Sequence, residues 1–162
     1  MDQTFMKEKK IADTKVKTIH MVRPGHLNAA GRLFGGVLMQ WMDEVAALAA
    51  MQYYEGNVVT GTVDSLTFIK GAHQGDMVRL CAQVTYTGRK TIEVRVEVHV
   101  QSLDGDLNLI NRAYFVMVAL PKKEGEPVQL PPLILETEEE KTEWENGNLR
   151  DILRKERRAD HF

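Results

Sequence analysis

The chain is 162 residues long, the length of one domain rather than two. It carries 21 Lys and Arg against 23 Asp and Glu, a net charge of −2, so it lacks the positive excess with which proteins bind nucleic acids or anionic membranes. The single cysteine, Cys81, can form no internal disulfide and excludes a cysteine-based zinc site. The first 17 residues lack the apolar run of a signal peptide, and no stretch is long and apolar enough to cross a bilayer, so we expect a cytoplasmic protein.

The first two predicted elements are a weak strand and a long helix. Residues 14–22 have weak strand character. Residues 35–51 follow a glycine-rich loop and are rich in Ala, Leu and Met, which are strong helix formers. At about 100° per residue their apolar side chains cover nearly every direction, so we predict a helix that is buried on most sides.

Four further strands are predicted after this helix. Residues 92–101 alternate apolar and polar side chains, which is typical of a strand with one buried and one wet face. Residues 58–69, 77–87 and 109–120 are β-branched and aromatic runs separated by turn-like segments, and such short connections favour antiparallel neighbours. We predict an α+β fold in which an antiparallel sheet of five to six strands curls around the helix. Its open side and edge strands would be left for a second copy, so we expect at least a dimer.

The composition changes after Pro121. Residues 136–145 are mostly acidic and residues 148–158 mostly basic. We therefore divide the chain into a lead-in (1–13), a domain (14–121), and a Pro-containing linker with a charged helical tail (122–162). The tail is interpreted as a solvated helix, with docking on a neighbouring subunit or nucleic-acid binding as alternatives.

Asp43 is the most informative residue of the predicted helix, because its helical neighbours are mostly apolar. Burying an ionised carboxylate without a partner is costly, so most sequences avoid it. Asp43 therefore either pairs with a structural partner or serves as a site carboxylate, which loss of hydration would make a stronger base. The residues alone leave both interpretations open.

The glycine-rich loop at residues 28–36 runs directly into the helix. Glycine lets the backbone approach a ligand, and the first amides of a helix are unpaired donors at its positive end. The loop is therefore either a receptor for an oxyanion or phosphate, or a tightly packed loop-to-helix junction. It is no Walker loop, because the Lys-Ser/Thr pair is missing.

The spacing of these two features indicates how they could cooperate. Gly35 and Asp43 are eight residues apart, about 12 Å along one helix. One reacting carbon must lie within about 3 Å of both an oxyanion donor and its base or nucleophile, so one chain cannot supply both residues to the same site. Two antiparallel helices across a two-fold axis would bring Gly35 of one chain to Asp43 of the other, giving two sites at a dimer interface.

A run of residues in the loop, the helix and the strands after it carries a family resemblance. These residues are Asn28, Gly31, Phe34, Gly35, Gly36, Val37, Leu38, Met39, Trp41, Met42 and Asp43, then Val59, Thr60, Asp64, Phe68, Gly75, Asp76 and residues 87–91. The pattern resembles hotdog-fold acyl-CoA thioesterases, most closely the YciA-like bacterial acyl-CoA hydrolases and their mammalian cytosolic relatives. The resemblance covers about residues 14–120 and implies the hotdog fold.

The resemblance also implies roles for four residues. Asp43 would be the general base or nucleophile, and Asn28 would help to hold the attacking water and the thioester. The backbone amide of Gly35 would polarise the thioester carbonyl, and Gly36 would allow close approach. In such enzymes Asp43 lies opposite Asn28 and Gly35 of the partner subunit, in agreement with the spacing argument.

A second segment is implied to bind the substrate. Thr87, Gly88, Arg89, Lys90 and Thr91 resemble the turn that meets the coenzyme A moiety, where Arg89 and Lys90 could pair with its phosphates. The implied reaction is hydrolysis of a fatty acyl-CoA to free acid and coenzyme A in a homo-oligomer, a tetramer or hexamer. Thiolate is a competent leaving group, so we expect no metal and no cofactor; we also expect no nucleic-acid or membrane partner.

Two other functions stay open. A hydratase or dehydratase on the same fold would need a catalytic histidine beside an acid, and only His26 is remotely placed for it. A non-catalytic acyl-CoA-binding module is the other alternative, although Asp43 would be an unusual choice in a pocket that merely holds a ligand.

Overall fold

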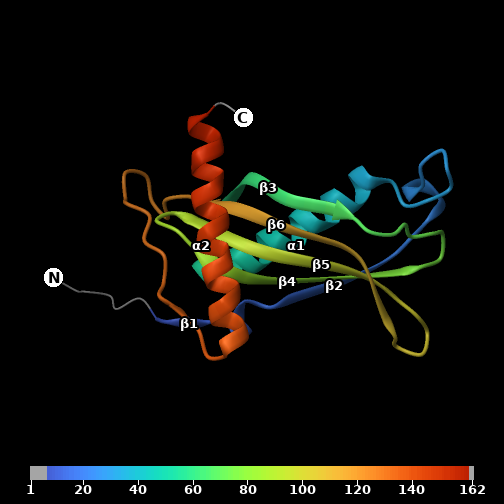
Figure 1. Cartoon of the computed structure of the whole chain (residues 1–162), viewed down its shortest axis with the longest axis horizontal. Coiled ribbons are helices and arrows are strands. Elements are labelled where there is room, and N and C mark those ends of the chain that lie inside the picture. Colours follow the sequence, from blue (N-terminus) through green and yellow to red (C-terminus); the bar gives the residue numbers. More distant parts are fainter. Residues whose placement is uncertain (1–6, 161–162) are drawn as a thin grey trace.

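A computed structural model describes residues 7–160, so residues 1–6 of the predicted lead-in and residues 161–162 of the predicted tail lie outside the described residues. The elements in chain order are β1 (Lys9–Lys10), η1 (Ile11–Thr14), β2 (Val16–Met21), η2 (Pro24–His26), α1 (Gly35–Tyr54), β3 (Val58–Phe68), β4 (Met77–Thr87), β5 (Thr91–Gln101), β6 (Leu107–Ala119), β7 (Leu133–Ile134) and α2 (Glu138–Ala159). Figure 1 shows how these elements are arranged.

The main sheet has five strands in the order β2-β4-β5-β6-β3, and every neighbouring pair is antiparallel. Its inner face packs on α1, so the predicted α+β architecture with a long helix against an antiparallel sheet is confirmed. Val94, Val96 and Val98 of β5 point into this core and are fully buried. Strands β2 and β3 form the two edges, and β3 runs beside α1 without a further strand partner in the described chain.

Helix α1 begins at Gly35 as predicted but ends at Tyr54, three residues beyond the predicted end. The extra turn is held by two buried tyrosines. The hydroxyl of Tyr54 donates to the carbonyl oxygen of Leu120 at 2.7 Å, and that of Tyr53 donates to Pro131. Glu55 then stops the helix in the left-handed conformation, with φ of 55°. Contacts this distant in the sequence extend the helix beyond the end that its own pattern predicts.

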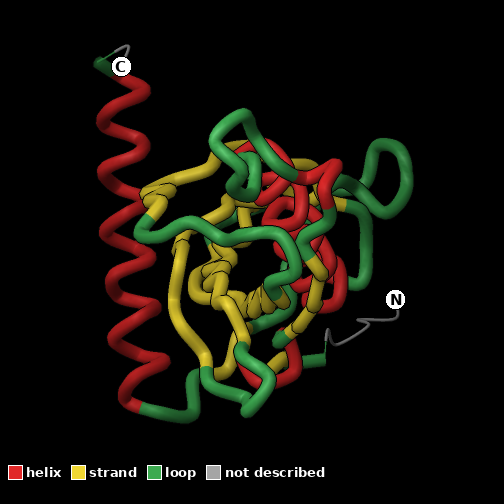
Figure 2. The backbone as a smooth tube through the Cα atoms, turned by 90° about the vertical axis from the view of Figure 1, so that its right-hand side faces the viewer, coloured by secondary structure: helices red, strands yellow, loops and turns green. Residues whose placement is uncertain are grey.

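Helix α2 lies across the outer face of the sheet (Figures 1 and 2). Gly147 allows the close approach, because a Cβ at this position would overlap Tyr86. The helix covers Glu93, which is 1% exposed, so the prediction of a wet outer face along residues 92–101 is wrong at this position. The interpretation of the tail as a solvated helix also needs correction, because Asp151 and Arg154 of α2 are buried against the chain's own sheet.

Candidate active site

The loop before α1 is held in shape by Asn28. Its side-chain Oδ1 accepts hydrogen bonds from the backbone amides of Ala30 at 3.0 Å and Arg32 at 3.1 Å. Gly31 lies between them with φ of 72°, a conformation that favours glycine. With Oδ1 directed into the loop, the side-chain NH₂ group of Asn28 is directed away from it. Because Asn28 is exposed, this group can donate to a ligand.

The first amides of α1 remain available as donors. Phe34 occupies the N-cap position and offers no side-chain acceptor, while its own amide donates to the carbonyl of His26 at 2.8 Å. The first bond of the helix runs from the amide of Leu38 to the carbonyl of Phe34, at 3.1 Å. The amides of residues 35–37 therefore have no partner within the helix and lie at its positive end. This is the arrangement predicted for an oxyanion receptor.

Two aromatic rings cover the first turn of α1. A Cβ at Gly35 would lie 3.2 Å from Cζ of Phe68 in β3, and a Cβ at Gly36 would lie 2.6 Å from Cε1 of Phe34. Glycine at these positions therefore lets both rings approach the backbone. Both rings are about half exposed, so they form an apolar surface around the free amides.

Asp43 has a hydrogen-bond partner that the sequence analysis did not assign a role. The Thr60 hydroxyl in β3 donates to Asp43 Oδ1 at 2.5 Å. The Thr60 hydroxyl also contacts the sulfur of the buried Met117 on the neighbouring strand at 3.6 Å, although Thr60 itself is exposed in the protomer. Asp43 is half-buried in the protomer rather than fully buried. Thr60 is among the residues that carry the family resemblance, but it is exposed in the protomer and no local pattern of β3 indicates that it pairs with Asp43.

Asp43 lies on a face of α1 that has no partner in the protomer. Gln40 and Glu44 on this face are exposed and hydrogen-bonded to each other at 3.0 Å. The apolar Leu48 and Met51 continue the face toward the helix end, 48% and 40% exposed. The prediction that the helix is buried on most sides therefore fails along this stripe, which matches the open side expected for a second copy.

The predicted coenzyme A turn lies at the other end of α1. Burial raises the pKa of the Tyr53 hydroxyl, near the C-terminal end of α1, to about 12, and the nearby Thr87 side chain acts in the opposite direction. The turn is closed by a bond from the amide of Gly88 to the carbonyl of Thr91 at 2.8 Å. Arg89 and Lys90 project from it into solvent. Within one protomer the turn and Gly35 are therefore separated by most of a helix about 30 Å long.

His26, the candidate for hydratase chemistry, packs against Trp41. The two rings are 5.1 Å apart in an edge-on arrangement, and His20 stacks on the same Trp41 at 4.3 Å. The Nδ1 atom of His26 accepts a hydrogen bond from the amide of Arg23 at 3.1 Å. Among the described residues no histidine is hydrogen-bonded to Asp43, so His26 braces the loop and forms no histidine–acid pair there.

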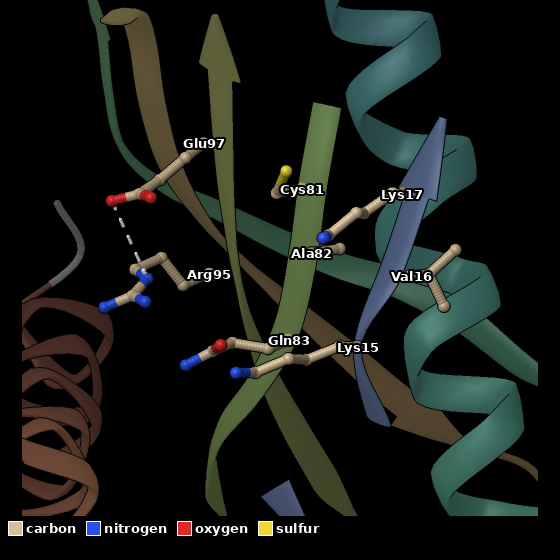
Figure 3. Close-up of a pocket in the computed structure, with 8 residues that line it drawn as sticks. All are labelled: Lys15, Val16, Lys17, Cys81, Ala82, Gln83, Arg95 and Glu97. Atoms are coloured by element: carbon tan, nitrogen blue, oxygen red, sulfur yellow. Dashed lines mark ion pairs between the residues drawn. The ribbon is translucent and has the colours of Figure 1, made fainter. Parts of the chain in front are cut away.

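A groove on the outer face of the sheet is unrelated to these residues (Figure 3). Its lining includes Lys15, Lys17, Cys81 and Arg95. Arg95 is already paired with Glu143 of α2 at 3.0 Å. Residues 7–160 contain no cluster of three or more His, Cys, Asp or Glu side chains that could hold a metal ion. Within the same range, no helix has the length and apolar character needed to span a bilayer.

Comparison with known sequences places these features in a family context. The family model of the thioesterase superfamily matches residues 30–104. The chain is 36% identical over 137 residues to an uncharacterized acyl-CoA thioester hydrolase of Bacillus subtilis, covering 84% of this chain and 76% of that protein. It is 34% identical over 146 residues to the cytosolic acyl coenzyme A thioester hydrolase of Rattus norvegicus, covering 88% of this chain. It spans only 38% of the length of that mammalian relative.

Solved structures extend the similarity to the fold. The acyl-CoA hydrolase of Staphylococcus aureus, in complex with butyryl coenzyme A, coenzyme A and coenzyme A disulfide, has a TM-score of 0.87 and 31% identity, covering 96% of this chain and 94% of that one. Variants of that enzyme with Ala in place of Asn28, Asp43 or Thr60 have also been solved, and this chain carries the same residue types at those numbers. A hexameric acyl-CoA thioesterase in the apo state has a TM-score of 0.87 and 35% identity, covering 95% of this chain and 99% of that one.

Proposed function

The chain belongs to the thioesterase superfamily as a relative of the acyl-CoA thioester hydrolases, and from this premise we propose that it hydrolyses acyl-CoA to a free acid and coenzyme A. The observation that carries the proposal is the Asp43–Thr60 pair on the unpartnered face of α1. The site combines this carboxylate with the free amides at the start of a second copy of the same helix. Thiolate leaves readily, so the reaction requires no metal and no cofactor other than the coenzyme A of the substrate.

The proposed chemistry begins at Asp43. Its carboxylate removes a proton from water, which attacks the thioester carbonyl, or it attacks the carbonyl itself to give a transient anhydride that water then opens. The Thr60 hydroxyl, bonded to Oδ1, holds the carboxylate in one orientation. The developing oxyanion is stabilised by the amide of Gly35 of the partner subunit, and the side-chain NH₂ group of Asn28 of the partner subunit helps to hold the water and the thioester. Collapse of the intermediate expels the coenzyme A thiolate.

The positions of the elements along α1 support a site shared by two protomers. Asp43 and Gly35 are about 12 Å apart in one helix, too far to act on one carbon. In an antiparallel pair of helices, Asp43 of one protomer approaches Gly35 of the other. The turn at residues 87–91, at the far end of α1, then comes toward the partner's first turn, where Arg89 and Lys90 can bind the phosphates of coenzyme A.

The surface of the protomer also favours self-association. The exposed Leu48 and Met51 lie on the same face of α1 as Asp43, and Val59 and Val63 are exposed on the edge strand β3 beside it. Apolar side chains and an unpaired strand edge are surfaces that proteins usually cover. We take the hexameric relative as support for a dimer or a higher homo-oligomer, and the cytosolic rat relative as support for a cytoplasmic enzyme.

Mixing two inactive variants tests both the reaction and the shared site. Wild-type protein should release free coenzyme A from butyryl-CoA, detected with a thiol-reactive dye, and Asp43→Asn and Asn28→Ala should each lose most of this activity. Dissociating and reassociating the two together should restore about one quarter of wild-type activity, because half the dimers are mixed and each has one intact site.

Two results would contradict the proposal. No recovery on mixing, with dimers confirmed by light scattering, would mean that each protomer builds its own site. Butyryl-CoA binding without release of coenzyme A by the wild type would favour the non-catalytic binding module instead.

A further inference from the structure

Asn111 in β6 is a fully buried amide whose hydrogen-bonding capacity is unused. Its exposure is 0%, and neither its Oδ1 nor its Nδ2 is hydrogen-bonded to any described residue. Of the described buried side chains with unpartnered polar atoms, Asn111 is the one that leaves both an oxygen and a nitrogen unpaired. Burying such a group without partners opposes folding, so buried amides are normally satisfied.

The register of the sheet places Asn111 close to the first turn of α1. It pairs with Val98 of β5, which faces α1, and on its other side with Phe68 of β3. A bulge between Val98 and His99 puts Ile110 and Asn111 together in the buried layer. Side chains directly opposite on neighbouring strands are about 5 Å apart, so Phe68 is in contact range of Asn111.

Phe68 separates Asn111 from the free amides of α1. The far end of its ring packs over Gly35, where a Cβ would lie 3.2 Å from Cζ. The side chain is 53% exposed, so rotation of the ring sacrifices little packing. An acyl group whose carbonyl lies at the amide of Gly35 therefore meets Phe68 first and Asn111 directly behind it.

We propose that Asn111 forms a polar subsite for the acyl chain, which binds an acyl group carrying a hydroxyl. This inference rests on the proposed function, since it takes the position of the reacting carbonyl from it. A hydroxyl matches the amide because it can accept from Nδ2 and donate to Oδ1. A plain alkyl chain leaves both atoms unpaired, and a site built to hydrogen-bond a substrate hydroxyl discriminates against the analogue that lacks it.

The test compares kcat/KM for hexanoyl-CoA with that for 3-hydroxyhexanoyl-CoA and 6-hydroxyhexanoyl-CoA, whose hydroxyls lie near to and far from the thioester. Wild-type protein should favour at least one hydroxylated substrate over hexanoyl-CoA. Asn111→Leu, which has a similar volume and no polar atoms, should reduce this preference about tenfold, the net contribution of about one hydrogen bond. Asn111→Ala is the second variant, scored in the same way, because its smaller side chain cannot overpack the core.

Val94→Ala is the matched control, because Val94 is equally buried on the inner face of β5 but pairs with Phe115, away from Asn111. It should lower the melting temperature and leave the substrate preference at the wild-type value. A wild-type enzyme without a hydroxyl preference, or a preference unchanged in both Asn111 variants, would overturn the proposal. If no thioester is hydrolysed at all, the proposed function fails. The affinity for the same three ligands, measured by calorimetry, then tests the subsite. A preference for a hydroxylated ligand that both Asn111 variants lose would support it, and no preference or an unchanged one would overturn it.

Discussion

On the outer face of the sheet, under α2, the buried charges are paired with one another, whereas on the inner face, along α1, polar side chains have one partner or none. Glu93 on the outer face accepts from Arg150 at 2.8 Å and from Arg154 at 2.9 Å. On the inner face Asp43 receives one hydrogen bond, from Thr60, and Asn111 receives none from the described residues. The contrast separates two kinds of buried polar group: charges that neutralise one another, such as Glu93 and its arginines, hold the fold together, whereas an amide such as Asn111 that leaves both polar atoms unpaired can still bind a ligand.

The outer network shows how thoroughly the charges of α2 are used. Arg150 bonds Glu143 at 2.9 Å and lies 3.7 Å from the ring centre of Tyr114. Burial alone would raise the pKa of Glu143, but the hydrogen bond from Tyr114 and the charges of Arg95 and Arg150 outweigh burial and lower the pKa. Three basic residues of the segment, Arg150, Arg154 and Arg157, therefore pair with carboxylates of the chain's own sheet and help to hold α2 against it.

The largest expected effect on activity comes from Asp43→Asn on the inner face. The substitution keeps the shape of the side chain and removes the base or nucleophile, so kcat should fall by a factor of about 10² to 10⁴. Thermal unfolding should change little, because Asp43 is half-buried and bound by one neutral partner. Steady-state hydrolysis of butyryl-CoA measures kcat, and a melting curve measures thermal stability. A large loss of stability with unchanged kcat would show that Asp43 is a structural residue and not the base or nucleophile.

Glu93→Gln on the outer face should lower stability and leave kcat nearly unchanged. It leaves the cations of Arg150 and Arg154 in a buried site with their shared carboxylate gone, which should reduce the free energy of unfolding by about 3 kcal/mol. Urea denaturation measures the loss, and kcat of the remaining folded protein should stay close to wild type. Glu97→Gln is the control, because Glu97 is more exposed and pairs with the exposed Arg112 at 2.6 Å, where ion pairs contribute less.

Thr60→Val should reduce activity less than Asp43→Asn does, because it removes only the hydrogen bond to the carboxylate. Valine keeps the branched shape in β3 and removes the hydroxyl that orients Asp43, so kcat should fall about tenfold, the net worth of about one charge-assisted hydrogen bond. KM should change little, because Thr60 acts through Asp43. Thr62→Val is the matched control, since the Thr62 hydroxyl bonds the carbonyl of Gly61 at 2.8 Å and has no contact with Asp43. An equal loss in both variants would indicate a general disturbance of β3.

The parts of the fold that local pattern determines could be predicted from the sequence. Helix α1 begins at Gly35 as predicted, and β4 has the predicted bounds, because glycine punctuation and side-chain alternation are local signals. Asp43 was identifiable because a carboxylate in an apolar helix is conspicuous. Its partner Thr60 is 17 residues away, and the ion pair of Glu93 with Arg150 spans 57 residues. Only the folded sheet brings such residues together, so the packing of α2 and the partner of Asp43 could not be predicted.

The smallest expected effect concerns His20, which stacks on Trp41 at the edge of the inner layer. Burial lowers the pKa of His20 from 6.5, with Glu44 raising it and His26 lowering it to a lesser degree. The unfolded chain therefore binds a proton at a higher pH than the folded protein, so stability should be full above pH 6.5 and decrease as the pH falls through 6.5 toward the folded pKa. His20→Phe keeps the stacked ring and removes the titration, so its urea midpoint should fall less than that of wild type between pH 7.5 and 5.5. Parallel pH profiles for the two proteins would show that His20 is not protonated more readily in the unfolded state.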